Sequence, residues 1–104
     1  MFIARWHIEA RFGHKQTVLD LLQQWDEEVG SQVGWTRDKF RIVTGSIGAK
    51  EAEIQTEVEV ESLAALEAAF AKLGSIERHA EWGREVEEYI VSGSTYWEIF
   101  RVVT

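Results

Sequence analysis

Apolar and polar residues alternate in three stretches of the chain, which predicts three β-strands with one buried face each. The stretches are residues 2–9, 40–44 and 52–60. Two glycines in segment 45–50 suit a turn, so the second and third strands are expected to form a hairpin. The buried face should carry Phe2, Ala4, Trp6, Ile8, Phe40, Ile42, Ile54, Val58 and Val60. The other face should carry Arg5, His7, Glu9, Arg41, Glu53, Gln55, Glu57 and Glu59.

Other segments show the apolar spacing of an amphipathic helix. One helix is expected from about His14 to Val29, with Gly30 as a left-handed stop. A second helix should cover residues 63–73, because Ser62 precedes it as a cap and Gly74 follows it.

The helical spacing then resumes over residues 76–90, so the second helix is expected to be broken at Gly74. Residues 31–38 have no clean period and should form a loop. Residues 95–103 are rich in aromatic and β-branched residues and predict a fourth strand. Both faces of that strand are apolar, so the pattern leaves its phase open.

The order of elements is therefore βαββαβ in a single domain covering residues 1–104. With right-handed crossovers, this order predicts the ferredoxin-like split βαβ arrangement, an α+β fold. Its four-stranded antiparallel sheet has the strand order 4-1-3-2 and carries the helices on one face.

Several segments resemble one known family. They are the hairpin of residues 40–60 running directly into Glu61-Ser62-Leu63, and the ending Val91-Ser92-Gly93-Ser94 followed by Tyr96-Trp97-Glu98-Ile99. Together with the element order, they resemble the NIPSNAP-like branch of the dimeric α/β-barrel superfamily over nearly the whole chain. That superfamily includes cofactor-free monooxygenases, haem-degrading enzymes, lactone isomerases and uncharacterised proteins. The resemblance implies a dimeric α/β barrel and no particular reaction.

The polar sheet face allows two interpretations. Acids of the third strand would lie between Arg5 and His7 on one side and Lys39 and Arg41 on the other, a favourable cross-strand arrangement. Such a face can be a solvated, charge-paired surface, or it can meet a second copy across a two-fold axis. The apolar last strand, which would otherwise be exposed, favours the homodimer.

Composition removes several classes of function. The chain has no cysteine, which excludes disulfides, thiolate nucleophiles and thiolate metal sites. Its net charge of −7 disfavours nucleic acid and anionic lipid as partners. No membrane-spanning run or secretion signal is evident, so no membrane partner is expected and a cytoplasmic location is predicted.

Five tryptophans are the main candidates for a binding site. Trp6 and Trp25 fall on core-facing positions, whereas Trp35, Trp82 and Trp97 suit either a pocket wall or a dimer contact. The predicted ligand-binding set is Trp6, His7, Trp82, Tyr89, Trp97 and Arg101.

His79 is the candidate catalytic residue, because it shares a helix face with Trp82 and could remove a proton from a bound molecule. The alternative is a structural histidine. A metal site of His7, Glu9 and Glu57 is disfavoured, since no metal-binding motif is present. The chain also lacks the Gly-x-Ser-x-Gly motif of a hydrolase and the glycine fingerprint of a nucleotide cofactor, so no cofactor is expected.

The sequence thus favours a homodimer that binds a small apolar ligand. It could be a cofactor-free monooxygenase or isomerase acting on a small aromatic or fatty compound. The alternative is a non-catalytic module that binds a ligand or a protein.

Overall fold

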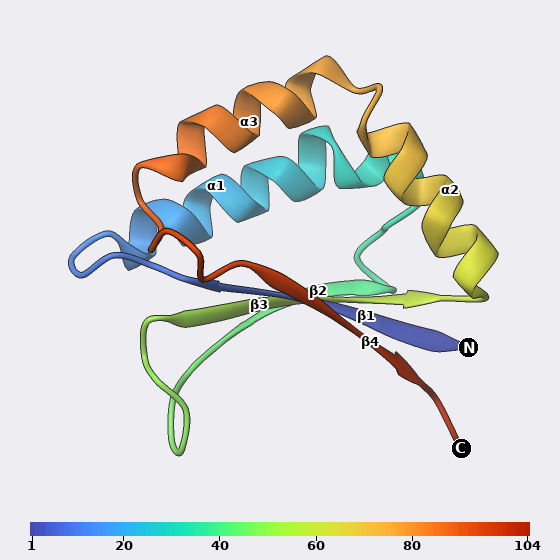
Figure 1. Ribbon diagram of the computed structural model, residues 1–104, viewed down its shortest axis with the longest axis horizontal. Helices are drawn as coiled ribbons and strands as arrows, with labels where there is room; N and C mark the ends of the chain where they lie inside the picture. The colour runs from blue at the N-terminus through green and yellow to red at the C-terminus, as the bar shows by residue number, and fades with distance from the viewer.

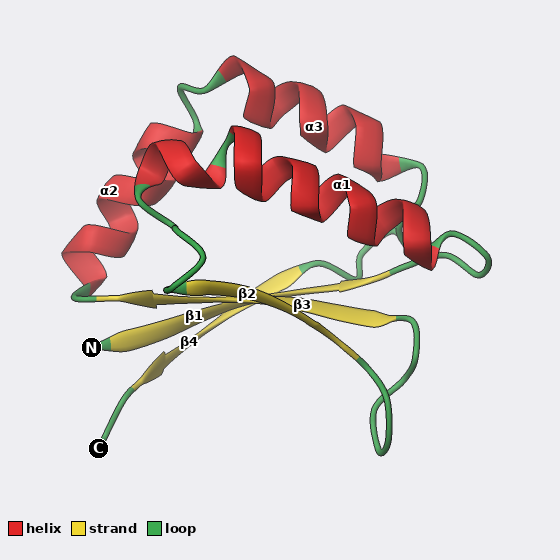
Figure 2. Cartoon of the chain, turned by 180° about the vertical axis from the view of Figure 1, so that it is seen from behind, coloured by secondary structure: helices red, strands yellow, loops and turns green.

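The computed structural model describes residues 1–104 as one sheet covered by helices on one face (Figure 1). The elements in chain order are β1 (Phe2–Glu9), α1 (Lys15–Glu28), a 3₁₀ turn (Gly30–Val33), β2 (Phe40–Thr44), β3 (Glu53–Val60), α2 (Leu63–Leu73), α3 (Glu77–Glu87) and β4 (Tyr96–Arg101). The sheet is antiparallel with the order β2-β3-β1-β4, which confirms the predicted topology. Figure 2 shows α1 and α3 side by side over the sheet, with α2 at one end.

The strand register places the predicted residues on the predicted faces. Trp6 is opposite Thr56 of β3 and Trp97 of β4, so these side chains all face the helices. The register also resolves the last strand, whose residues Trp97, Ile99 and Arg101 lie on the helix side. Tyr96, Glu98 and Phe100 lie on the other side, which is called the open face below.

The helices differ from the prediction in one detail, at Gly30. Gly30 does not end α1 in the left-handed region; it begins the 3₁₀ turn, and Gly34 takes the positive φ of 77°. A side chain at Gly30 would crowd Trp25, since an added Cβ would lie 3.1 Å from its ring. The break at Gly74 produces two separate helices, α2 and α3.

Ser62 caps α2 as predicted, because its hydroxyl oxygen accepts a hydrogen bond of 3.0 Å from the Ala65 amide. None of the helices combines the length and the apolar character needed to cross a lipid bilayer.

Candidate functional site

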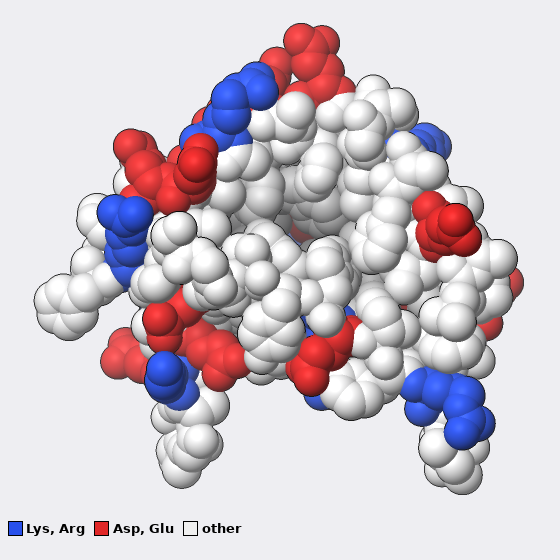
Figure 3. Space-filling model, viewed as in Figure 1, with Lys and Arg blue, Asp and Glu red and all other residues white.

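A cavity of about 310 Å³ lies between the sheet and the helices. Figure 3 shows a hollow surrounded mostly by uncharged side chains between the helical layer and the β4 edge of the sheet. The lining residues are Trp6, Leu22, Trp25, Trp35, Thr56, Phe70, Leu73, Gly74, His79, Trp82 and Trp97. No Lys, Arg, Asp or Glu is among them, so the wall is apolar apart from a few polar atoms.

All five tryptophans line this cavity, and their rings form a closed circuit. Consecutive ring centroids lie 6.1 Å apart for Trp6 and Trp82, 6.2 Å for Trp82 and Trp25, and 6.0 Å for Trp25 and Trp35. The circuit closes through Trp97, which lies 6.4 Å from Trp35 and 6.3 Å from Trp6. All five ring pairs are inclined to each other, an arrangement that aromatic rings favour and that leaves room between them.

Different local features bring each indole to the cavity. Strand alternation directs Trp6 and Trp97 to the helix side, and helical spacing directs Trp25 and Trp82 toward the sheet. Trp35 follows the left-handed Gly34, and its backbone amide donates a 3.0 Å hydrogen bond to the carbonyl of Gly30. The turn after α1 therefore closes one wall of the cavity.

Two indole N–H groups are committed to hydrogen bonds within the protein. Trp82 donates to the backbone carbonyl of Leu21 over 2.6 Å, and Trp25 donates to Nδ1 of His79 over 3.0 Å. Burial lowers the pKa of His79 from its ordinary value of 6.5, because the charged imidazolium is poorly solvated there. Since Nδ1 already accepts the indole N–H, this nitrogen is not free to take a proton from a ligand.

The structure brings together four of the seven residues predicted for the site: Trp6, His79, Trp82 and Trp97. The other three do not line the cavity. His7 points to the open face because it is one residue out of phase with Trp6.

Tyr89 and Arg101 also lie outside the wall of this cavity. Tyr89 follows the last turn of α3 and packs against His14, with ring centroids 5.4 Å apart. Arg101 shares the helix-side phase of Trp97 but ends β4 opposite Phe2, beyond the cavity. A residue on the correct face of a helix or strand can therefore still lie too far along it to reach the cavity.

Trp35, which the sequence allowed as a pocket wall or a dimer contact, lines the cavity, and six further wall residues were not predicted: Leu22, Trp25, Thr56, Phe70, Leu73 and Gly74. Trp25 was assigned to the core, and it is both buried and part of the wall. Thr56 is the one polar residue among the apolar residues on the inner face of β3. Its hydroxyl group was a signal in the sequence that this position could line a site.

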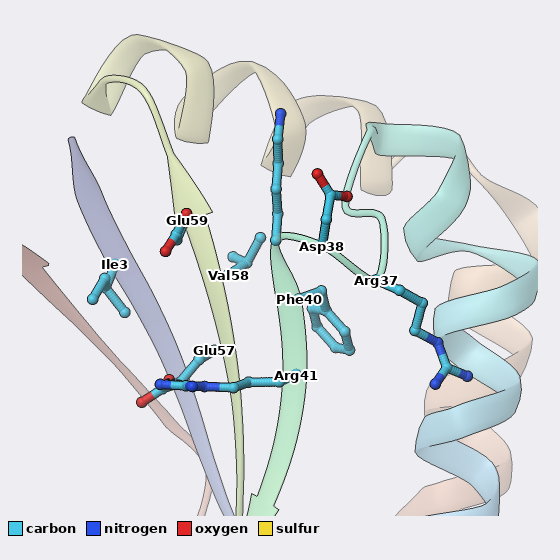
Figure 4. Close-up of a pocket in the computed structure, with 9 residues that line it drawn as sticks. Ile3, Arg37, Asp38, Phe40, Arg41, Glu57, Val58 and Glu59 are labelled. Atoms are coloured by element: carbon cyan, nitrogen blue, oxygen red, sulfur yellow. Dashed lines mark hydrogen bonds and ion pairs between the residues drawn. The ribbon is translucent and has the colours of Figure 1, made fainter.

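The open face carries a network of ion pairs. Glu57 accepts hydrogen bonds from Nε of Arg5 over 2.6 Å and from Nε of Arg41 over 2.7 Å. Figure 4 shows Arg41 extending from β2 toward Glu57 on β3. Burial raises the pKa of Glu57, but the hydrogen bonds and charges of Arg41 and Arg5 outweigh it, so the pKa falls below 4.5. The recess beside this network has a volume of about 130 Å³ and mainly charged walls, which do not suit an apolar ligand.

His7 belongs to the same face. Its Nδ1 lies 3.2 Å from a carboxylate oxygen of Glu53, its Nε2 lies 2.5 Å from one of Glu98, and its ring stacks on Tyr96 at 4.2 Å. No group of three or more His, Asp or Glu side chains is arranged to hold a metal ion.

No known family model matches the chain, and no curated protein matches its sequence. Solved structures do resemble it. A NIPSNAP family protein from Agrobacterium tumefaciens is 15% identical with a TM-score of 0.79, covering 96% of this chain and 90% of its own. An uncharacterised NIPSNAP domain protein from Burkholderia xenovorans is 12% identical with a TM-score of 0.78, covering 100% and 96%.

A third similar structure is an antibiotic biosynthesis monooxygenase, 12% identical with a TM-score of 0.72 and full coverage of both chains. These likenesses confirm the predicted ferredoxin-like fold and the resemblance to NIPSNAP proteins at the level of the fold. At such low identity, they carry no residue roles to this chain.

The buried His79 makes stability depend on pH. The unfolded chain binds a proton near pH 6.5, whereas the folded state resists protonation until a lower pH, so stability should fall as pH decreases through this window. We expect His79→Gln to flatten the fall in urea midpoint between about pH 7.5 and about pH 5.5, at fixed protein concentration. The exposed His14→Gln serves as the control and should keep the wild-type slope. An unchanged slope in His79→Gln would contradict the assignment.

Proposed function

We propose that this protein binds a small, uncharged aromatic molecule in the cavity formed by the five tryptophans. The observation that carries the proposal is that these indoles surround a space of about 310 Å³ without filling it. Ligand pockets start at roughly 300 Å³ and are mostly apolar with few polar groups. The cavity is therefore suited to a ligand of one or two fused rings.

The cavity favours an aromatic ligand over a fatty acid. Inclined indole rings offer both faces and edges to a flat ligand. A carboxylate, by contrast, would find no Lys or Arg in the wall and would remain unpaired in an apolar site. Of the aromatic and fatty compounds expected from the sequence, the aromatic class is therefore the one we propose.

Catalysis on the bound molecule is the second candidate, supported by the shared fold with an antibiotic biosynthesis monooxygenase. A cofactor-free monooxygenase or an isomerase would need a proton acceptor other than Nδ1 of His79. Oxygen uptake with electron-rich phenols would support this candidate, and binding without turnover would support the non-catalytic module.

We also propose that the open face joins a second copy of the chain. The Arg5–Glu57–Arg41 network pairs the carboxylate of Glu57 with two guanidinium groups of its own chain, so this carboxylate stays paired when the face is covered. Around them, Val43, Tyr96 and Phe100 are 38%, 51% and 44% exposed. A self-complementary patch of apolar groups around paired charges suits a two-fold interface.

Trp97 provides the test of ligand binding. Its side chain lines the cavity and is 39% exposed, so Trp97→Ala removes one of the five indoles without opening the buried core. We expect this variant to weaken binding of the neutral two-ring probe 2-naphthol by about 1 kcal/mol, or roughly fivefold in Kd, measured by probe fluorescence. Tyr96→Ala, on the same strand but the opposite face, should bind as the wild type does. Equal binding by all three proteins would reject the cavity as the site.

Glu57 provides the test of the dimer. Glu57→Lys places a third positive charge beside Arg5 and Arg41, so the open face should no longer pair with its copy. We expect a shift from dimer to monomer in sedimentation velocity, with folding checked by circular dichroism. Glu67→Lys makes the same charge change at an exposed position on α2 and should remain dimeric. A wild-type protein that sediments as a monomer would refute the proposed interface.

A further inference from the structure

The hydrogen bond between Trp25 and His79 determines which nitrogen of the imidazole carries the proton. An indole N–H can only donate, so Nδ1 of His79 must supply the lone pair across the 3.0 Å contact. A neutral imidazole has one lone pair and one N–H group. The proton of neutral His79 must therefore lie on Nε2.

The imidazole is neutral at physiological pH, because burial lowers the pKa of His79 and no charged side chain lines the cavity to reverse this effect. The neighbouring Arg78 is engaged by Glu28 and Glu85, at 2.6 Å and 3.0 Å. The tautomer set by Trp25 is thus the form that a ligand meets.

The Nε2–H group is free to interact with a ligand. No protein group is hydrogen-bonded to it. It is also not fully enclosed, because the only fully enclosed side-chain nitrogen or oxygen without a well-aligned hydrogen bond is Nε2 of His7, which instead makes its close contact with Glu98. Nε2 of His79 is therefore partly accessible, and His79 lines the cavity.

We propose that Trp25 is a positioning residue that holds His79 as a hydrogen-bond donor, so that the cavity selects aromatic ligands bearing an uncharged acceptor such as a carbonyl oxygen. The selectivity rests on the proposed binding function, whereas the tautomer does not. The opposite tautomer would leave Nε2 able to act as a base, but it would direct two N–H donors at each other across 3.0 Å.

The tautomer can be measured without a ligand by ¹⁵N NMR of the imidazole nitrogens. We expect Nδ1 of His79 to give the unprotonated resonance and Nε2 the protonated one. Trp25→Phe should release Nδ1 and shift both resonances toward a mixture of tautomers. Trp82→Phe is the matched control, because it also deletes one indole N–H, whose acceptor is the Leu21 carbonyl, and it should leave His79 unchanged. Protonated Nδ1 in the wild-type protein would overturn the inference, even if Trp25→Phe fails to fold.

Ligand selection is tested with acetonaphthone and isopropylnaphthalene, which have similar shapes but differ in the carbonyl acceptor. The ketone should bind about fivefold more tightly to the wild-type protein, and His79→Phe should abolish the preference. Equal affinities for the wild type would refute the selection while supporting the proposed function. If neither compound binds, the proposed function and the selection both fail, and the NMR result alone decides whether Trp25 fixes the tautomer.

Discussion

The register of β1 between β3 and β4 is the constraint on which the site depends. It pairs Trp6 with Thr56 and Trp97 on the inner face, and Arg5 with Glu57 on the open face. A slip of one residue would bring His7 into the cavity and send Trp6 to the open face. Both faces oppose such a slip, because it would separate the ion pairs as well as expose the apolar side chains. The ionic face thus helps to hold the indoles in place, although it is remote from any ligand.

The open space among the indoles also has a structural basis. Protein interiors are usually packed as densely as organic crystals, so a space of about 310 Å³ requires walls that cannot collapse into it. Trp25 and Trp82 are each fixed by an N–H hydrogen bond as well as by ring contacts. The turn at Gly74 separates α2 from α3, so the two helices approach the sheet at different places. The cavity walls are therefore supported by three helices, α1, α2 and α3.

Much of the fold could be predicted from the sequence because β1, β2 and β3 each have one apolar and one polar face. The same logic could not fix β4, whose Tyr96 and Trp97 are both apolar yet lie on opposite faces. For the site, helical and strand periods predicted the direction in which Trp6 and Trp82 point. They did not predict how far along its element each residue lies, which is why Tyr89 and Arg101 do not line the cavity. The Trp25–His79 hydrogen bond joins two helices that are distant in the chain, and no local sequence pattern predicts such a contact.

The closed circuit of indoles has an optical consequence. Each ring lies within about 6.4 Å of the next, so excitation energy absorbed by one can migrate among all five before it is emitted. The tryptophan emission of the protein then comes from five indoles that exchange excitation energy. A bound molecule that quenches one indole would also lower the emission of the other four, so tryptophan fluorescence would report whether the cavity is occupied.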